Sequence, residues 1–222
     1  MKITVKARLA FAPPWSPTSV NGGPEKFRAR LMFDPKADWG KASIKEIRAA
    51  RLAVATEKWK TKAKAEAILE LIAGDKNKES WFEKDYRTQD GELIEGFEGM
   101  YHLSTLADVQ PLMIDRDRTE LTKRDGRLYS GCYVVAKLDI WAQKNDHGNG
   151  MRATIMGLQF WKDGEAFGGG GQRANAEDFE DLSDLGDDED APTTRRRPAD
   201  DEDEPAPRKR RRPVEDDDDD IG

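Results

Sequence analysis

Residues 131–161 read GCYVVAKLDIWAQKNDHGNGMRATIMGLQFW, two runs of alternating residues joined by a stretch rich in Asn and Gly. Alternation with a period of two is typical of a strand with one buried and one exposed face. Asn and Gly between such runs supply the positive φ angles that a tight hairpin needs. The pattern therefore predicts a long β-hairpin, with strands over about 130–143 and 151–161.

The register of this hairpin predicts what each face carries. If Trp141 lies opposite Arg152, one face gathers an apolar set suited to a barrel interior: Cys132, Val134, Ala136, Leu138, Ile140, Ala153 and Ile155. The other face then combines rings with cations: Tyr133, Lys137, Trp141, Arg152 and Phe160. Such a face suits single-stranded nucleic acid, because bases stack on rings and phosphates meet cations. Packing of the rings under another element is the alternative, and a one-residue slip would exchange the faces.

Two more strands are predicted near the N-terminus, each with a basic row opposite an apolar row. The apolar rows are Ile3, Val5, Ala7, Leu9 and Phe11, then Phe27, Ala29, Leu31 and Phe33. The basic rows include Lys6 and Arg8 on the first strand and Arg28 and Arg30 on the second. No acid interrupts either row, which favours a surface that faces an anion. A solvated outer face is the alternative.

Helical spacing replaces alternation over about 41–73, which predicts two helices or one bent helix with a break near residues 60–62. Ser43 followed by Glu46 fits a capping box at the helix start. Short strands are expected at 101–106 and 111–115. Strands at both ends with helix between them predict a mainly β fold, a small β-barrel of the OB-fold type with a helical insertion.

Charge divides the chain into two parts. Residues 1–173 carry 29 Lys and Arg against 24 Asp and Glu, a net charge of +5, whereas residues 174–222 carry 8 against 20, a net charge of −12. Apolar residues nearly vanish after position 173, so a disordered acidic tail is predicted. The tail contains basic clusters at 195–197 and 208–212. It ends in a run expected to regulate binding or contact partners: Asp216, Asp217, Asp218, Asp219, Asp220 and Ile221.

No catalytic, metal-binding or cofactor-binding pattern stands out. A single cysteine excludes an intramolecular disulfide framework, and two distant histidines cannot build a Cys/His metal cluster. Asp115 and Asp117 could hold a metal ion, but their alternation with Arg116 and Arg118 favours a salt-bridged loop. No apolar run is long enough to span a membrane. We therefore expect a soluble binding protein without cofactors rather than an enzyme.

An ordered set of motifs closely resembles the hallmark region of single-stranded DNA-binding proteins from tailed bacteriophages. The motifs are DRDRT at 115–119, Y-x-GCYV at 129–134, IWAQ at 140–143, the glycine turn at 144–150, G-x-QF at 157–160 and DGEAFGGG at 163–170. With the strand-then-helix opening, the resemblance covers about residues 1–171. It implies an OB-fold that coats single-stranded DNA during phage replication and recombination, in the cytoplasm of the infected host.

The expected function is non-specific coating of single-stranded DNA in phage replication, recombination and repair. The acidic tail would compete with phosphate for the cations of residues 1–173 and recruit replication or recombination proteins. Assembly of several copies along the DNA is also expected. Three alternatives stay open: an RNA-binding or strand-annealing protein of the same fold, a Mg²⁺-dependent nuclease or its accessory that uses Asp115 and Asp117, and an acidic chaperone of basic proteins.

Overall fold

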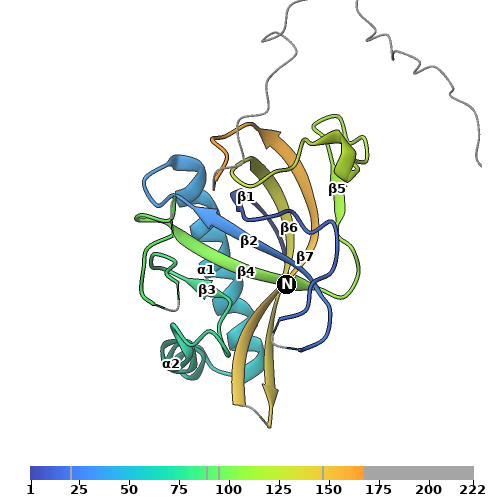
Figure 1. Cartoon of the computed structure of the whole chain (residues 1–222). Helices are drawn as coiled ribbons and strands as arrows, with labels where there is room; N and C mark the ends of the chain where they lie inside the picture. Colours follow the sequence, from blue (N-terminus) through green and yellow to red (C-terminus); the bar gives the residue numbers. More distant parts are fainter. Residues whose placement is uncertain (21, 89, 95, 147, 168–222) are drawn as a thin grey trace, which may run out of the picture. The chain divides into compact units, whose positions relative to one another are not determined.

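The structure is a computed structural model of the 222-residue chain, and it describes residues 1–20, 22–88, 90–94, 96–146 and 148–167. The predicted tail, including Asp216–Asp220, Ile221 and both basic clusters, lies outside the described residues. Figure 1 shows the elements in chain order: β1 (Lys2–Ala10), β2 (Phe27–Phe33), α1 (Asp38–Trp59), α2 (Lys62–Ile72), β3 (Trp81–Phe82), β4 (Tyr101–Ala107), β5 (Leu112–Ile114), the 3-10 turn η1 (Lys123–Asp125), β6 (Tyr133–Asn145) and β7 (Gly148–Lys162).

Five of the strands close into a barrel. β1 pairs antiparallel with β2 and β6, β2 pairs antiparallel with β4, and β6 pairs antiparallel with β7. A parallel contact between Leu106 of β4 and Thr154 of β7 completes the ring. This order, β1-β2-β4-β7-β6, is that of the five-stranded OB-fold barrel. The predicted fold class is confirmed, with α1 and α2 inserted between β2 and β4.

The β6–β7 hairpin confirms the predicted register at its centre and departs from it further along. Trp141 lies opposite Arg152, and the apolar set from Cys132 to Ile155 is buried. A β-bulge follows, because Leu138 pairs with Ile155 whereas Lys137 pairs with Gly157. The extra residue reverses the alternation of side chains along the rest of β7.

Phe160 is therefore placed differently from the prediction. Its ring belongs to the barrel core, opposite Val134 and only 1% exposed, instead of lying on the outer face with Arg152. A side chain buried to this extent cannot offer its face to a base. The predicted placement of Phe160 on the outer face is wrong, and the physical reason is the β-bulge between Arg152 and Phe160.

Helix α1 fills a gap in the barrel wall. β2 pairs with β1 only over Arg8–Ala10, so the earlier part of β1 lacks a strand partner on that side. The Ser43 hydroxyl of α1 takes this place, accepting from the Lys6 amide at 3.1 Å and donating to the Lys6 carbonyl at 2.8 Å. Ser43 thus lies inside α1, which begins at Asp38, and the predicted capping box is wrong.

The predicted break between the helices is confirmed. Lys60 ends α1 with a φ of 77°, and the Thr61 hydroxyl accepts from the Lys64 amide to cap α2. In the part of the chain that the structure describes, no helix is long and apolar enough to cross a membrane.

Candidate nucleic-acid interface

A groove crosses the outer face of β2 and β4. Its main hollow, of about 660 Å³, lies between these strands, the segment 76–88 and the start of β7. A neighbouring hollow of about 380 Å³ extends toward the loop after β1 and shares part of the lining. The shared residues are Arg28, Arg30, Tyr86, Ser104 and Leu106. In OB-folds this face and the adjoining loops bind oligonucleotides.

The groove is predominantly cationic. Its lining holds six basic side chains, Arg28, Arg30, Lys76, Lys84, Arg87 and Arg152, against two acids. Of the acids, Glu79 is buried and forms an ion pair with Arg51, which lies outside the main hollow. Asp85 accepts a hydrogen bond from the Gly99 amide at 2.7 Å and forms an ion pair with Arg87 at 3.9 Å. Both carboxylates are therefore engaged, and the other five basic side chains of the groove have no carboxylate of the described residues within ion-pair distance.

Arg30 and Arg152 are half-buried in this groove. Arg30 stacks 3.8 Å from the centre of the Tyr86 ring, and the Arg152 guanidinium donates to the Gln143 side chain and the Asn77 carbonyl. Burial lowers the pKa of both guanidinium groups, although both stay charged. No carboxylate of the described residues lies within ion-pair distance of either one. Glu79 and Asp75 act on Arg152 only from beyond this distance, so a phosphate could pair directly with either guanidinium in bidentate geometry.

The His102 side chain contacts the Arg30 guanidinium and helps to position it. Its Nδ1 lies 3.3 Å from the Arg30 guanidinium, which can only donate, so Nδ1 must accept. Burial, and then the charge of Arg30, lower the pKa of His102 to about 3. The imidazole is therefore neutral at neutral pH and adds no charge that would repel Arg30.

Aromatic rings lie along the groove. Phe11 stacks on Phe97 at 5.8 Å and meets Tyr86 edge-on at 6.0 Å. Phe11 was expected in the buried row of β1, but a φ of 61° turns it outward and leaves it 43% exposed. Trp141 is 41% exposed beside Arg152, and its Nε1 donates to Thr154 at 3.0 Å. Exposed rings beside cations are what non-specific single-strand binding requires.

The predicted site residues fall into two sets. Arg28, Arg30 and Arg152 share the groove, and Trp141 stands next to it. Lys6, Arg8 and Tyr133 lie instead on the outer face of β1 and β6, where Lys137 is also exposed. The sheet pattern alone could not separate the sets, because the barrel wall curves between them.

Several groove residues escaped sequence reasoning: Phe11, Lys76, Lys84, Tyr86 and Arg87. Four of them belong to the stretch DKNKESWFEKDYRT at 75–88, which has neither a helical nor a strand period. The available signal was compositional, namely rings interleaved with lysines and arginine.

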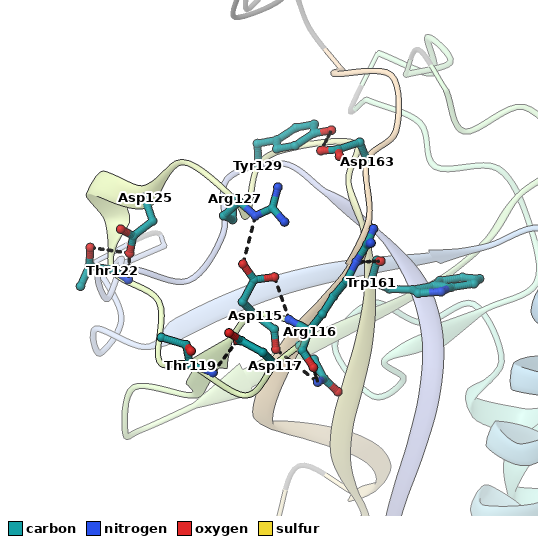
Figure 2. A network of polar contacts seen from close by, with 11 residues as sticks. Asp115, Arg116, Asp117, Thr119, Thr122, Asp125, Arg127, Tyr129, Trp161 and Asp163 are labelled. Atoms are coloured by element: carbon teal, nitrogen blue, oxygen red, sulfur yellow. Dashed lines mark hydrogen bonds and ion pairs between the residues drawn. The ribbon is translucent and has the colours of Figure 1, made fainter. Parts of the chain in front are cut away.

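The DRDRT loop is a turn held by an ion pair, but Asp115 pairs with Arg127 and not, as predicted, with the alternating Arg116 or Arg118 (Figure 2). Asp115 accepts from the Arg127 guanidinium at 3.1 Å and from the Arg116 amide at 2.7 Å. Asp117 accepts from the Thr119 amide at 2.9 Å. The hydrogen bonds from these backbone amides lower the pKa of both carboxyl groups. The carboxylates thus serve separate partners, and no group of three potential metal ligands occurs among the described residues.

Comparisons with known proteins agree with this architecture. A family described as "Enterobacter phage Enc34, ssDNA-binding protein" matches residues 1–191. Protein p50 of Acyrthosiphon pisum secondary endosymbiont phage 1 is 40% identical over 185 residues, which cover 82% of this chain and 95% of p50.

Solved structures of the single-stranded DNA-binding protein from bacteriophage Enc34 share the fold. Its complex with ssDNA matches with a TM-score of 0.59 and 20% identity, covering 75% of this chain and 89% of that chain. A C-terminal truncation matches with a TM-score of 0.56 and 22% identity, covering 75% and 88%. The family match extends over most of the sequence, and the chain belongs to the phage single-stranded DNA-binding protein family typified by that of Enterobacter phage Enc34.

Proposed function

We propose that this chain binds single-stranded DNA in the groove over β2 and β4, without reading its sequence. The observation that carries the proposal is the pair Arg30 and Arg152, two half-buried guanidinium groups with no carboxylate of the described residues within ion-pair distance. They lie on the face that OB-folds use for oligonucleotides, in a chain that belongs to a family of phage single-stranded DNA-binding proteins.

Binding combines phosphate contacts with base stacking. Arg28, Arg30 and Arg152 meet the phosphates, and these contacts carry no sequence information. One face of Tyr86 is already covered by Arg30, so the exposed rings of Phe11 and Trp141 are the better platforms for bases. Each stacked base contributes about 1–3 kcal/mol and is tolerated whatever its identity, because every base has a π-face.

The biological role proposed for this activity is the coating of single-stranded DNA during phage replication, recombination and repair in the host cytoplasm. The protein acts by binding alone. Residues 174–222 carry a net charge of −12 and would compete with DNA phosphate for the groove cations. Their end, Asp216–Asp220 with Ile221, would recruit replication or recombination proteins, and several copies would assemble along one strand.

The direct test removes both of these guanidinium groups. Arg30→Gln/Arg152→Gln in the full chain should bind a fluorescent oligothymidine at least about tenfold more weakly, since charged hydrogen bonds contribute about 1.5–3 kcal/mol each. The slope of log K against log salt should fall by about 0.7 for each phosphate that is no longer neutralised.

The matched control is Lys45→Gln/Lys64→Gln, which removes the same charge from exposed positions on α1 and α2. It should bind nearly as the natural chain does. If the arginine variant keeps its fold by circular dichroism and binds with unchanged affinity, the groove is not the binding site.

A further inference from the structure

Three aromatic rings form a corner on the outer surface of the barrel, away from the groove lining. Trp39 comes from the start of α1, Tyr133 from the start of β6 and Trp161 from the end of β7. Each pair packs edge-to-face, with ring centres 5.6 Å apart for Trp39 and Tyr133, 6.3 Å for Trp39 and Trp161, and 6.0 Å for Tyr133 and Trp161. All three rings are partly exposed. We call them the aromatic corner.

The aromatic corner holds a cluster of cations. The Lys6 ammonium lies 4.5 Å from the centre of the Trp161 ring, and the Lys162 ammonium lies 4.5 Å from Tyr133 and 4.9 Å from Trp161. The Arg8 guanidinium lies 5.5 Å from Tyr133. Because the ammonium groups lie over the ring faces, the rings fix the positions of the charges instead of offering open faces to bases.

These cations lack countercharges within the described part of the chain. No carboxylate there lies within ion-pair distance of Lys6, Arg8 or Lys162. Arg8 instead donates to two backbone carbonyls, those of Gly131 at 2.9 Å and Glu165 at 2.6 Å. Like charges held close together repel one another, and an anion bound between them would relieve that repulsion.

A continuous series of contacts joins the groove to the aromatic corner. Arg30 stacks on Tyr86 at 3.8 Å, and Tyr86 meets Phe97 at 5.3 Å. Phe167 packs against the same small apolar cluster as Tyr86, and it lies 3.9 Å from the Arg8 guanidinium. Arg8 in turn borders the aromatic corner. Phe97 is buried within this series, so a polyanion that leaves the groove would meet the partly exposed rings of Tyr86 and Phe167 and then the Arg8 cation.

We propose that Lys6, Arg8 and Lys162, held by the aromatic corner, are a second contact for the phosphate backbone of single-stranded DNA. This inference rests on the proposed function of the groove, and it extends the path of the strand around the barrel. A short strand fills the groove alone, and a longer strand reaches both sites. These three cations contact phosphates, and the rings of the aromatic corner do not stack with bases.

The test compares two lengths of oligothymidine across a salt series. One OB-fold covers about 4–16 nucleotides, so an oligonucleotide of about 6 nucleotides should fill the groove without reaching the aromatic corner. Lys6→Gln/Lys162→Gln in the full chain should therefore bind this short oligonucleotide as the natural chain does. With about 20 nucleotides, its slope of log K against log salt should be smaller by about 1.4, or 0.7 for each phosphate that the lysines no longer neutralise. The exposed Lys45→Gln/Lys64→Gln variant controls for the change in net charge.

A second variant checks the role of the rings. Trp161→Leu keeps both lysines but removes the ring that they share, and it should weaken binding of the long oligonucleotide by about two- to fivefold while the short one is unaffected. This range follows because a cation–π contact at an exposed site contributes less than the roughly 1.4 kcal/mol that corresponds to a tenfold change in affinity.

Three results would overturn the inference. An unchanged salt slope of the lysine variant with the long oligonucleotide would show that the second contact does not exist, while the proposed binding in the groove would still stand. Tighter binding of long oligonucleotides by the lysine variant would mean that the cluster holds an acidic polypeptide, such as the chain's own residues 174–222. Equal weakening for both lengths would place the lysines in the groove site itself. Failure of the natural chain to bind either length would instead contradict the proposed function.

Discussion

Single residues of the groove show how burial and charge work together. Arg30 is held between the Tyr86 ring and the neutral His102 side chain, so its charge is oriented without being neutralised. Sequence reasoning found Arg30 because an alternating strand puts it opposite the apolar row. It could not find His102 or Tyr86, since the role of each depends on contacts between segments that are distant in sequence.

Titration of His102 should make stability depend on pH. Its pKa is about 3 in the folded protein against 6.5 ordinarily, so the unfolded chain binds the proton more readily. The contribution of His102 to stability is therefore full above about pH 6.5 and is lost as the pH falls toward 3, at up to about 1.4 kcal/mol per pH unit. The free energy of unfolding, measured by urea denaturation at a series of pH values, should show this loss in the natural chain and not in His102→Gln. Parallel dependences of the free energy on pH for the two proteins would contradict the prediction.

Trp141 and Phe160, both predicted to touch nucleic acid, should now behave in opposite ways. Trp141→Ala removes an exposed ring and should weaken DNA binding by about 1–3 kcal/mol with little change in thermal stability. Phe160→Ala empties a core position and should cost about 3–5 kcal/mol of folding free energy. Melting curves and binding titrations of both variants would check this, and a strong binding defect in a stable Phe160 variant would argue against its place in the core.

At the scale of elements, the strands of the barrel were predicted and their irregularities were not. Alternation indicated β1, β2, β6 and β7, and the pairing of Trp141 with Arg152, because a half-buried strand has to alternate. The bulge near Gly157 was missed although the sequence marks it, with a glycine inside the strand and a shift of the buried apolar residues from odd positions (153, 155) to even positions (158, 160). The start of α1 was misplaced because Ser43 resembles a cap and serves the backbone of β1 instead.

Ser43→Ala should destabilise the fold. The amide and carbonyl of Lys6 would lose two part-buried hydrogen bonds, which contribute about 0.5–1.5 kcal/mol each. Chemical denaturation should show this decrease, whereas Ser16→Ala, at an exposed loop position, should show almost none. Equal stability of the two variants would mean that α1 does not close the gap through Ser43.

For the molecule as a whole, closure of the barrel decides which cations act together. Basic rows on β1 and β2 looked alike in the sequence, yet they point to the aromatic corner and to the groove respectively. The segment 75–88 then covers one side of the groove with further cations. The position of these cations depends on the three-dimensional path of segment 75–88, which has neither a helical nor a strand period. The composition of the segment alone could not predict that path.

The charge of residues 174–222 should act on the whole molecule. Removal of this −12 segment should tighten binding of single-stranded DNA, most strongly at low salt where its electrostatic competition is least screened. A titration of the full chain and of a chain ending at Arg173 would measure the difference. Weaker binding after truncation would show that the arginines at 195–197 and 208–212 hold DNA themselves.

Photochemical cross-linking would locate the bound DNA, which we propose to lie over β2 and β4. An oligothymidine carrying iodouracil would be irradiated with the full chain, and the cross-linked peptides mapped by mass spectrometry. Stacked bases react with the rings beside them, so cross-links are expected at Phe11, Tyr86 or Trp141. Cross-links confined to rings outside the groove, with none at these three, would show that the DNA binds elsewhere.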